Sequence, residues 1–179
     1  MPHSRTPTQS HLRLGLTNEV IEVQHPWTAP TFRVALIREG GDSIIERASM
    51  DRPEVVAATF AEHLQFADRE HFVVMLLCTQ NRLIGLHTAS IGTLNTSLVC
   101  PREVFKAAIL ANAASVIVGH NHPSGDPSPS PEDQATTHDL RRAGRILDIP
   151  VLDHIIVGDR GRFCSLKRMG VFDSLLDLA

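Results

Sequence analysis

The sequence predicts one α/β domain, a mixed sheet flanked by helices, behind a polar N-terminal leader. Two patterns favour this fold class: short β-branched runs alternate with helical stretches, and turn-forming residues separate them. The 179 residues suffice for one domain of about 100–150 residues and a flexible end. Apolar residues make up 42% of the chain, which is enough for a real core.

The leader covers residues 1–29, which contain much Ser, Thr, Pro and His and show no stable period. This composition predicts a flexible polar tail. Residues 30–50 are expected to form a strand and linker, because TFRVALI at 31–37 alternates and a Gly-Gly pair follows it. The folded domain is expected to cover residues 51–179.

The first part of this domain combines a helix with a hairpin. Residues 51–67 have helical periodicity, and Asp51 is expected to cap the N-terminus of that helix. The β-rich runs 72–78 and 83–91 are separated by Thr-Gln-Asn-Arg, which indicates a β-hairpin.

The second part alternates helices with strands. Pro101 opens a helix over residues 103–113, because proline is tolerated in a first helical turn. The apolar run 115–119 predicts a strand, and the four prolines in 123–131 exclude regular structure there. A further helix is expected over residues 130–147. Two closing strands and a short terminal helix are expected at residues 151–157, 162–166 and 171–178.

Charge and cysteine content disfavour several function classes. The net charge is −3, whereas nucleic-acid binders usually carry a basic excess. No apolar run approaches the roughly 20 residues of a membrane span, and residues 1–16 lack the apolar region of a secretory signal. Three cysteines without a C-x-x-C pair indicate reduced thiols rather than a disulfide scaffold or a thiolate zinc site. We therefore expect a cytoplasmic protein with no membrane partner.

Two histidines at the end of a predicted strand are the first sign of a metal site. His120 and His122 are two residues apart, so their side chains point to the same face. Two imidazoles presented in this way form half of a tetrahedral zinc site. A His-x-His pair alone is weak evidence, because two unrelated loop histidines would look the same.

Asp133 completes the pattern. Ser130 is expected to cap the next helix, which places Asp133 in the first turn, where its side chain projects back toward the histidines. Two His and one Asp with an open fourth position are typical of a catalytic zinc site. A capping box between Ser130 and Asp133 explains the same residues and is compatible with the metal site. Asp126 is an alternative ligand, although the prolines around it favour a role in the loop.

Hydrolysis at zinc also needs a carboxylate that takes a proton from the attacking water. Glu70 precedes a hydrophobic strand, and an active-site group can emerge at a strand end. Glu103 lies in a first helical turn, where the helix dipole alone explains an acidic residue. We favour Glu70 over Glu103.

These residues resemble a known family motif. The run His-Asn-His-Pro at 120–123, followed by Ser130 and Asp133, resembles the JAMM/MPN+ metalloprotease motif, in which a Glu precedes His-x-His-Pro and Ser-x-x-Asp. The stretch PREVF at 101–105 is similar to the RadC-type branch of JAB-domain proteins. So are HNHPSGDP, which begins at His120, and the Asp-His pair at 153–154.

The resemblance covers about residues 50–170 and implies a JAB/MPN, cytidine-deaminase-like fold around one Zn²⁺. It implies that the ligands are His120, His122 and Asp133, and that Glu70 is the general acid/base. Ser130 would steady the oxyanion of the tetrahedral intermediate. His154 would be either structural or, with Asp153, a pair that orients a ligand.

Two departures from the family pattern stand out. Asn121 lies where many JAMM proteases carry Ser or Thr, which weakens an inference to a ubiquitin-type substrate. The helix-hairpin-helix segment that often precedes the domain is not recognisable in residues 1–50, so the chain resembles a short form.

The leading functional hypothesis is a zinc-dependent metallopeptidase or isopeptidase-like hydrolase acting on a protein or peptide. The alternatives are a DNA-repair-associated role, because RadC-type proteins were named for DNA repair, and a metal-binding scaffold without turnover. Charge does not support a nucleic-acid partner, and the intact ligand set argues against the scaffold.

Overall fold

The computed structural model describes residues 49–92 and 99–173, together with positions 11–12, 21–22, 33 and 37. The chain divides into two compact units, Met1–Val34 and Ala35–Ala179. In the first unit, strand β1 (His11–Leu12) pairs antiparallel with β2 (Ile21–Glu22). The tail expected over 1–29 and the strand expected over 31–37 lie almost wholly outside the described residues and stay predictions.

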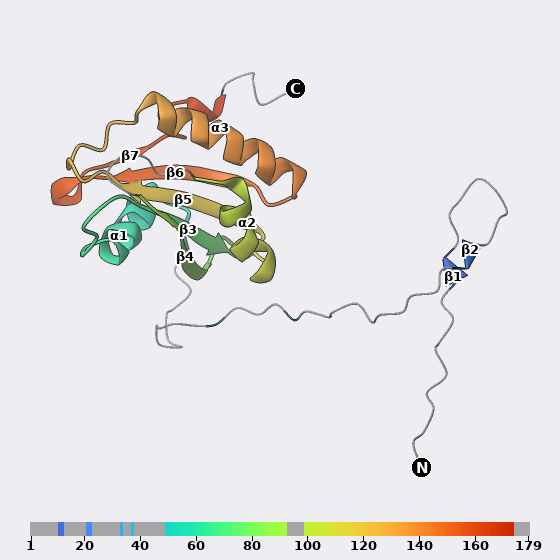
Figure 1. Cartoon of the computed structure of the whole chain (residues 1–179). Coiled ribbons are helices and arrows are strands. Elements are labelled where there is room, and N and C mark those ends of the chain that lie inside the picture. The colour runs from blue at the N-terminus through green and yellow to red at the C-terminus, as the bar shows by residue number, and fades with distance from the viewer. Residues whose placement is uncertain are drawn as a thin grey trace, which may run out of the picture. The chain divides into compact units, whose positions relative to one another are not determined.

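The second unit is built on a five-stranded sheet with the order β4-β3-β5-β6-β7 (Figure 1). β5 runs parallel to β6, and the other neighbours are antiparallel. The predicted mixed sheet and the predicted hairpin, β3 with β4, are therefore confirmed. The strands are β3 (His71–Leu77), β4 (Leu83–Ile91), β5 (Ser115–Asn121), β6 (Val151–Val157) and β7 (Phe163–Ser165).

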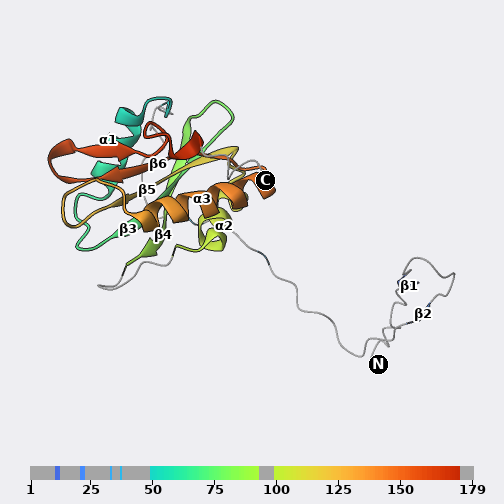
Figure 2. The same cartoon turned by 90° about the horizontal axis from the view of Figure 1, so that it is seen from above.

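Three α-helices cover the two faces of this sheet (Figures 1 and 2). Helix α1 (Pro53–His63) packs on one face. Helices α2 (Pro101–Leu110) and α3 (Pro131–Ile146) pack on the other. Each α-helix has a proline in its first turn, where the missing N–H costs no hydrogen bond. The result is a three-layer α/β unit.

The core consists of two apolar layers, because successive residues of β3 point to opposite faces. Phe72, Val74 and Leu76 face α2 and α3, whereas Val73, Met75 and Leu77 face α1. Burying a large side chain such as Phe60 of α1 or Phe105 of α2 contributes about 1.5–3 kcal/mol. Strand β3 is buried from both sides and fixes the positions of its neighbours.

The start of α1 differs from the prediction that Asp51 caps it. The N-cap is Arg52, which makes no side-chain cap hydrogen bond. Asp51 instead accepts hydrogen bonds from Ser49 and from the Asn81 side chain, the latter at 3.0 Å. A β-bridge between Ser49 and Arg82 draws this segment onto the β3–β4 turn, so the carboxylate is used there.

The C-terminal ends of two predicted helices differ from the structure or lie outside its described part. Helix α2 ends at Leu110 rather than 113, because Asn112 adopts a positive φ of 50° that breaks the helix. The described part of the expected terminal helix is a 3₁₀ turn, η2 (Val171–Asp173), and residues 174–178 lie outside the described part. A second 3₁₀ turn, η1 (Asp159–Gly161), connects β6 with β7.

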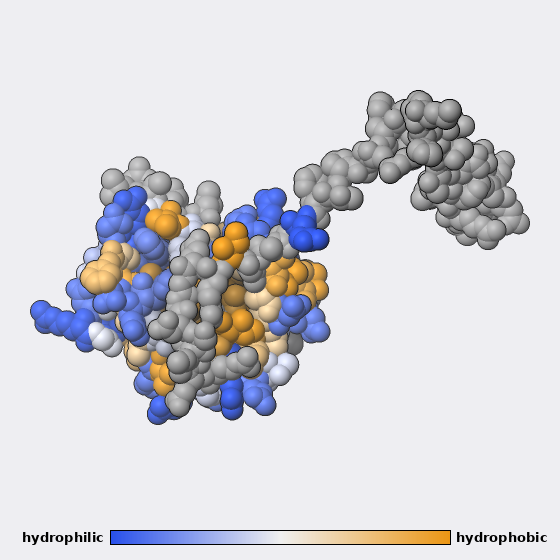
Figure 3. Space-filling view, turned by 90° about the horizontal axis from the view of Figure 1, so that it is seen from below, coloured by the Kyte–Doolittle hydropathy of each residue, from blue (hydrophilic) through white to orange (hydrophobic). Residues whose placement is uncertain are grey.

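On the face shown in Figure 3, small groups of hydrophobic residues lie between hydrophilic ones. Within the described residues, no helix combines the length and apolar character required to cross a membrane.

Gly119 in β5 should not tolerate a side chain. A Cβ there would lie 2.7 Å from the Phe60 ring and 2.9 Å from the backbone oxygen of Ile155, and neither group can move away. We expect Gly119→Ala to lower the free energy of unfolding by about 1–3 kcal/mol, measured by urea denaturation. Gly85→Ala, in β4, is the matched control, because a Cβ there meets nothing within 4 Å. Equal losses in the two variants would contradict this packing argument.

Candidate metal centre

His120 and His122 converge at the end of β5, as predicted. His120 is fully buried, and His122 is partly exposed. Their Nε2 atoms lie 3.0 Å apart. The His120 ring stacks on Phe72 of β3, with ring centroids 5.9 Å apart and planes 12° from parallel. The apolar layer beneath the sheet end thus holds one imidazole in place and leaves its outer edge facing His122.

Asp133 reaches the two histidines from the first turn of α3. Its Oδ1 lies 3.2 Å from His120 Nε2, and its Oδ2 lies 3.5 Å from His122 Nε2. The capping box also forms: the Ser130 backbone N–H donates to Asp133 Oδ2 at 2.7 Å, and the Asp133 N–H donates to Ser130 Oγ at 3.1 Å. The capping and ligand interpretations of Asp133 therefore hold together, because the same cap directs its carboxylate toward β5.

The hydrogen on His122 is fixed by a backbone carbonyl. His122 Nδ1 lies 2.7 Å from the carbonyl oxygen of Asp126. A carbonyl only accepts, so Nδ1 carries the hydrogen, and Nε2 of the neutral ring is a free lone pair. The Asp126 carboxylate accepts from Ser128 instead. Asp126 therefore contributes its main chain, and its carboxylate is not part of the ligand group.

The hydrogen on His120 is fixed by a chain of two further residues. The single hydroxyl hydrogen of Thr137 goes to the Asp133 carbonyl at 2.6 Å. Thr137 Oγ1 must then accept from His154 Nδ1, also at 2.6 Å, which leaves His154 Nε2 as an acceptor. His120 Nδ1 donates to that atom at 2.9 Å. In its neutral form, His120 therefore also presents its Nε2 lone pair to the site.

This series of hydrogen bonds requires His154 to be neutral. Burial, followed by the nearby charge of His120, lowers the pKa of His154 well below its usual value. Partial burial opposes ionisation of Asp133, but its hydrogen bonds to His120 and Ser130 outweigh that effect and lower its pKa. The site therefore brings two imidazole side chains against one carboxylate.

Three groups that can each donate an electron pair to a metal thus face one another, with the ligand atoms 3.0–3.5 Å apart. With both imidazoles neutral, their Nε2 lone pairs and the carboxylate would repel one another, and a metal cation among them would remove that repulsion. In a tetrahedral zinc site, ligand atoms about 2.0–2.1 Å from the metal lie about 3.3 Å apart. Among the described residues, His120, His122 and Asp133 form the group that could hold a metal ion.

The loop between the histidines and α3 is fastened at Gly125. Its N–H donates to the His122 carbonyl at 2.9 Å, and its own carbonyl accepts from Asp159 N and Arg162 Nη2. Gly125 has a φ of 76°, and a Cβ there would overlap the Asp159 carboxylate. These contacts hold the Asp126 carbonyl where His122 needs it.

Glu70 immediately precedes β3 and is partly buried. Phe72 lies opposite His120 in the last pair of the β3–β5 register, and Glu70 precedes Phe72 by two residues, so Glu70 lies at the end of the sheet that carries the histidines. Its role as general base stays a prediction. Glu103, in the first turn of α2, forms an ion pair with Lys106 on the surface. The Lys106 hydrogen bond lowers the pKa of Glu103.

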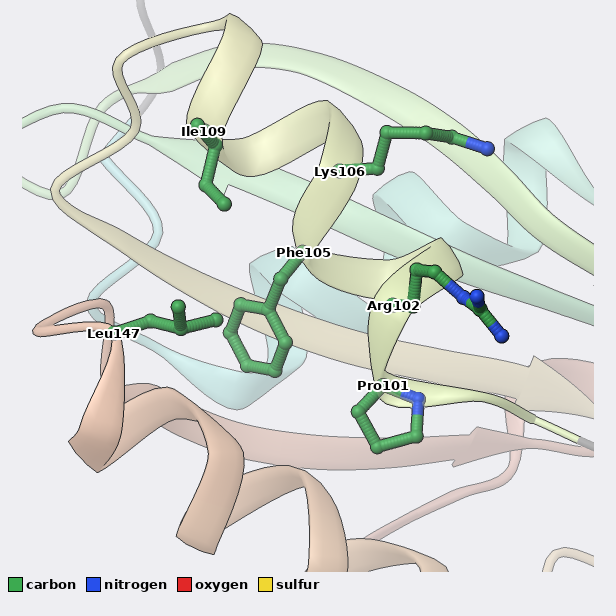
Figure 4. Close-up of a pocket in the computed structure, with 6 residues that line it drawn as sticks. All are labelled: Pro101, Arg102, Phe105, Lys106, Ile109 and Leu147. Carbon is green, nitrogen blue, oxygen red and sulfur yellow. The ribbon is translucent and has the colours of Figure 1, made fainter. Parts of the chain in front are cut away.

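A separate pocket lies between α2 and the end of α3 (Figure 4), and it contains none of the predicted site residues. The residues that line it are Pro101, Arg102, Phe105, Lys106, Ile109 and Leu147.

Sequence reasoning missed Thr137 and the Asp126 carbonyl. Thr137 follows Asp133 by one helical turn, a spacing that could have been noticed. The expected pairing of Asp153 with His154 at a ligand is only half right. His154 contacts His120, whereas the Asp153 carboxylate accepts from Ser165 Oγ at 2.6 Å and joins β6 to β7.

We expect the purified chain to bind about one zinc ion, measured by elemental analysis. His122→Ala and Asp133→Ala should each remove most of that zinc, because each deletes one of three ligands. His63→Ala is the matched control, because His63 lies in α1 on the other face of the sheet. Equal zinc in all four proteins would show that the metal binds elsewhere.

His154→Phe should weaken metal binding about 10–100-fold, because the variant keeps a ring of similar size but leaves His120 Nδ1 without an acceptor. Thr137→Val perturbs the same chain from its far end and should give a smaller loss. The measurement is competition with a chromophoric chelator. Unchanged affinity in both variants would contradict the hydrogen positions derived above.

Comparisons with known proteins agree with this geometry. Residues 50–171 match the family described as the RadC-like JAB domain. The chain is 52% identical over 128 residues to a UPF0758 protein of Caldanaerobacter subterraneus, covering 72% of this chain and 54% of that protein. It is 53% identical over 129 residues to a UPF0758 protein of Shouchella clausii, covering 72% and 56%.

The chain thus spans about half the length of the curated relatives it matches. The names of these relatives state no activity. The family match covers the helices and strands that carry the candidate ligands. On these grounds the chain belongs to the RadC-like JAB domain family.

Proposed function

We propose that this chain is a zinc-dependent hydrolase that cleaves an amide bond in a protein or peptide. The observation that carries the proposal is the convergence of His120 Nε2, His122 Nε2 and the Asp133 carboxylate on one point. Three protein ligands leave one position of a tetrahedral metal open, which is the pattern of catalytic rather than structural zinc.

Zinc is the metal that this donor set favours, because two imidazoles and one carboxylate suit it better than they suit Mg²⁺ or Ca²⁺. Bound there, it supplies Lewis acidity, which lowers the pKa of water and polarises a carbonyl. None of the three cysteines, all of which the structure describes, forms a disulfide, which is consistent with a reducing compartment, and we propose a cytoplasmic location.

Glu70 is the proposed general base and acid. Its carboxylate takes a proton from the attacking water and passes that proton to the leaving amine as the amide bond breaks. Strand direction supports this role, because Glu70 precedes β3 at the end of the sheet where β5 delivers the two histidines. Glu103 is the weaker candidate, because Lys106 already neutralises its carboxylate.

Ser130 is proposed to donate a hydrogen bond to the carbonyl oxygen as negative charge develops on it. Its hydroxyl donates to Asp133 Oδ2 at 2.7 Å, so rotation about the Cβ–Oγ bond must redirect the hydrogen in this role. The backbone N–H of Ser130 still holds Asp133 Oδ2 when the hydroxyl turns.

The test exposes the zinc-loaded chain to a mixed library of proteins and peptides and identifies new termini by mass spectrometry. We expect amide cleavage that Glu70→Gln reduces about 10²–10⁴-fold at unchanged zinc content. Glu103→Gln should cleave normally, because it alters a surface ion pair.

Two outcomes would overturn the proposal. If the zinc-loaded chain produces no new terminus across the library, the hydrolase assignment is wrong. If Glu103→Gln loses activity and Glu70→Gln keeps it, the hydrolase assignment stands and the general base has been misassigned.

A further inference from the structure

Asn121 lies between the two histidines and points its side chain away from them, across to the segment that precedes β3. Its Oδ1 accepts from the backbone N–H of His71 at 2.8 Å. Its Nδ2 donates to the backbone carbonyl of Arg69 at 2.9 Å. One side-chain amide therefore binds the main chain on both sides of Glu70.

These two bonds begin where the backbone pairing stops. The β3–β5 pairing ends with Phe72 opposite His120. Beyond that point β5 continues beside β6: Asn121 pairs with Val157, and the His122 N–H donates to the Val157 carbonyl at 3.2 Å. The Asn121 amide therefore supplies the attachment between the two strands that the backbone of β5 no longer provides.

The residue between these two hydrogen bonds is Glu70, the proposed general base. The carbonyl of Glu70 also accepts from Gly92 N–H at 2.8 Å, on the side of β4. Glu70 thus has its main chain held by β4 on one side, and its two flanking peptide groups are held by Asn121 on the other. Only its side chain remains free to act at the metal centre.

An amide is the side chain that this position requires. The two contacts need one acceptor and one donor, side by side, which Asn supplies. Asp would offer two acceptors and repel the Arg69 carbonyl. Ser or Thr would have to accept and donate through a single oxygen, whereas Asn offers the acceptor and the donor on separate atoms.

We propose that Asn121 is a positioning residue that holds Glu70 in register with His122, so that the carboxylate reaches the water at the metal. The inference rests on the proposed function of Glu70. It also gives a physical reason for the Asn at this position, which the sequence alone shows only as a departure from the Ser or Thr of many JAMM proteases.

Acetohydroxamate binding tests the positioning role of Asn121 without any knowledge of the substrate. A hydroxamic acid chelates the metal and gives up its proton to a nearby carboxylate, so its affinity reports on Glu70. The full chain is loaded with Co²⁺, and acetohydroxamate is titrated by visible absorption. Co²⁺ affinity is measured first for every variant and should be the same, because neither Glu70 nor Asn121 belongs to the ligand group.

We expect Glu70→Gln to weaken acetohydroxamate binding at least about tenfold, and Asn121→Ala about three- to tenfold. In the Glu70→Gln background, Asn121→Ala should cause no further loss, because its effect passes through that carboxylate. Asn121→Asp keeps the acceptor for His71 and loses the donor, so it should act in the same direction and serves if the Ala variant folds poorly.

Asn81→Ala is the matched control. It removes an asparagine side-chain hydrogen bond at the other end of the same hairpin and should leave acetohydroxamate affinity unchanged.

The outcomes separate the two levels of the proposal. If Glu70→Gln weakens binding but Asn121→Ala does not, or if the two losses add in the double variant, the positioning role is wrong and the base assignment stands. If Glu70→Gln has no effect on binding, the base assignment itself fails, and the role of Asn121 fails with it.

Discussion

The metal centre depends on how β5 pairs with its two neighbours. Because β5 runs antiparallel to β3 and parallel to β6, one end of the sheet collects the start of β3 and the ends of β5 and β6. Strand direction alone therefore brings the two histidines, the end of β6 and the segment that precedes β3 to the same end of the sheet. In this arrangement the backbone pairing between β3 and β5 stops before it reaches Glu70. The Asn121 side-chain amide supplies the hydrogen bonds to the main chain on both sides of that residue.

The same pairing determines the protonation of the site. His154 of β6 lies beside Val118 of β5, which places its ring against His120 and against Thr137 of α3. The Asp133 carbonyl in α3 thus orients the Thr137 hydroxyl. That hydroxyl in turn determines which ring nitrogen carries the hydrogen in His154, and His154 sets the direction of the bond from His120 Nδ1. Hydrogen bonds at the Nδ1 atoms of both histidines thus direct their Nε2 atoms toward Asp133, so the fold itself organises the ligand group.

Local patterns predicted much of this arrangement, and long-range pairing explains the rest. The mixed sheet, the hairpin and the Ser130–Asp133 cap follow from signals within a few residues. The convergence of His120, His122 and Asp133 follows from signals of the same kind. Asp51 was misassigned because its partner, Asn81, lies in a turn distant in sequence. The contacts of His154 and Asn121 could not be derived for a similar reason: both depend on how strands that are far apart in sequence pair with one another, which local patterns do not give.

Asp133 shows why folding and chemistry are hard to separate here. Its Oδ2 accepts from the backbone and hydroxyl of Ser130 and so completes the start of α3, while its Oδ1 faces His120. One carboxylate therefore ends a stiff proline-rich loop, begins a helix and closes the ligand group. A substitution of Asp133 intended to remove only the metal ligand would also lose the cap, which is worth about 0.5–2 kcal/mol. The effect of such a change on stability and its effect on metal binding must accordingly be measured in the same protein, because the geometry assigns both to the same atoms.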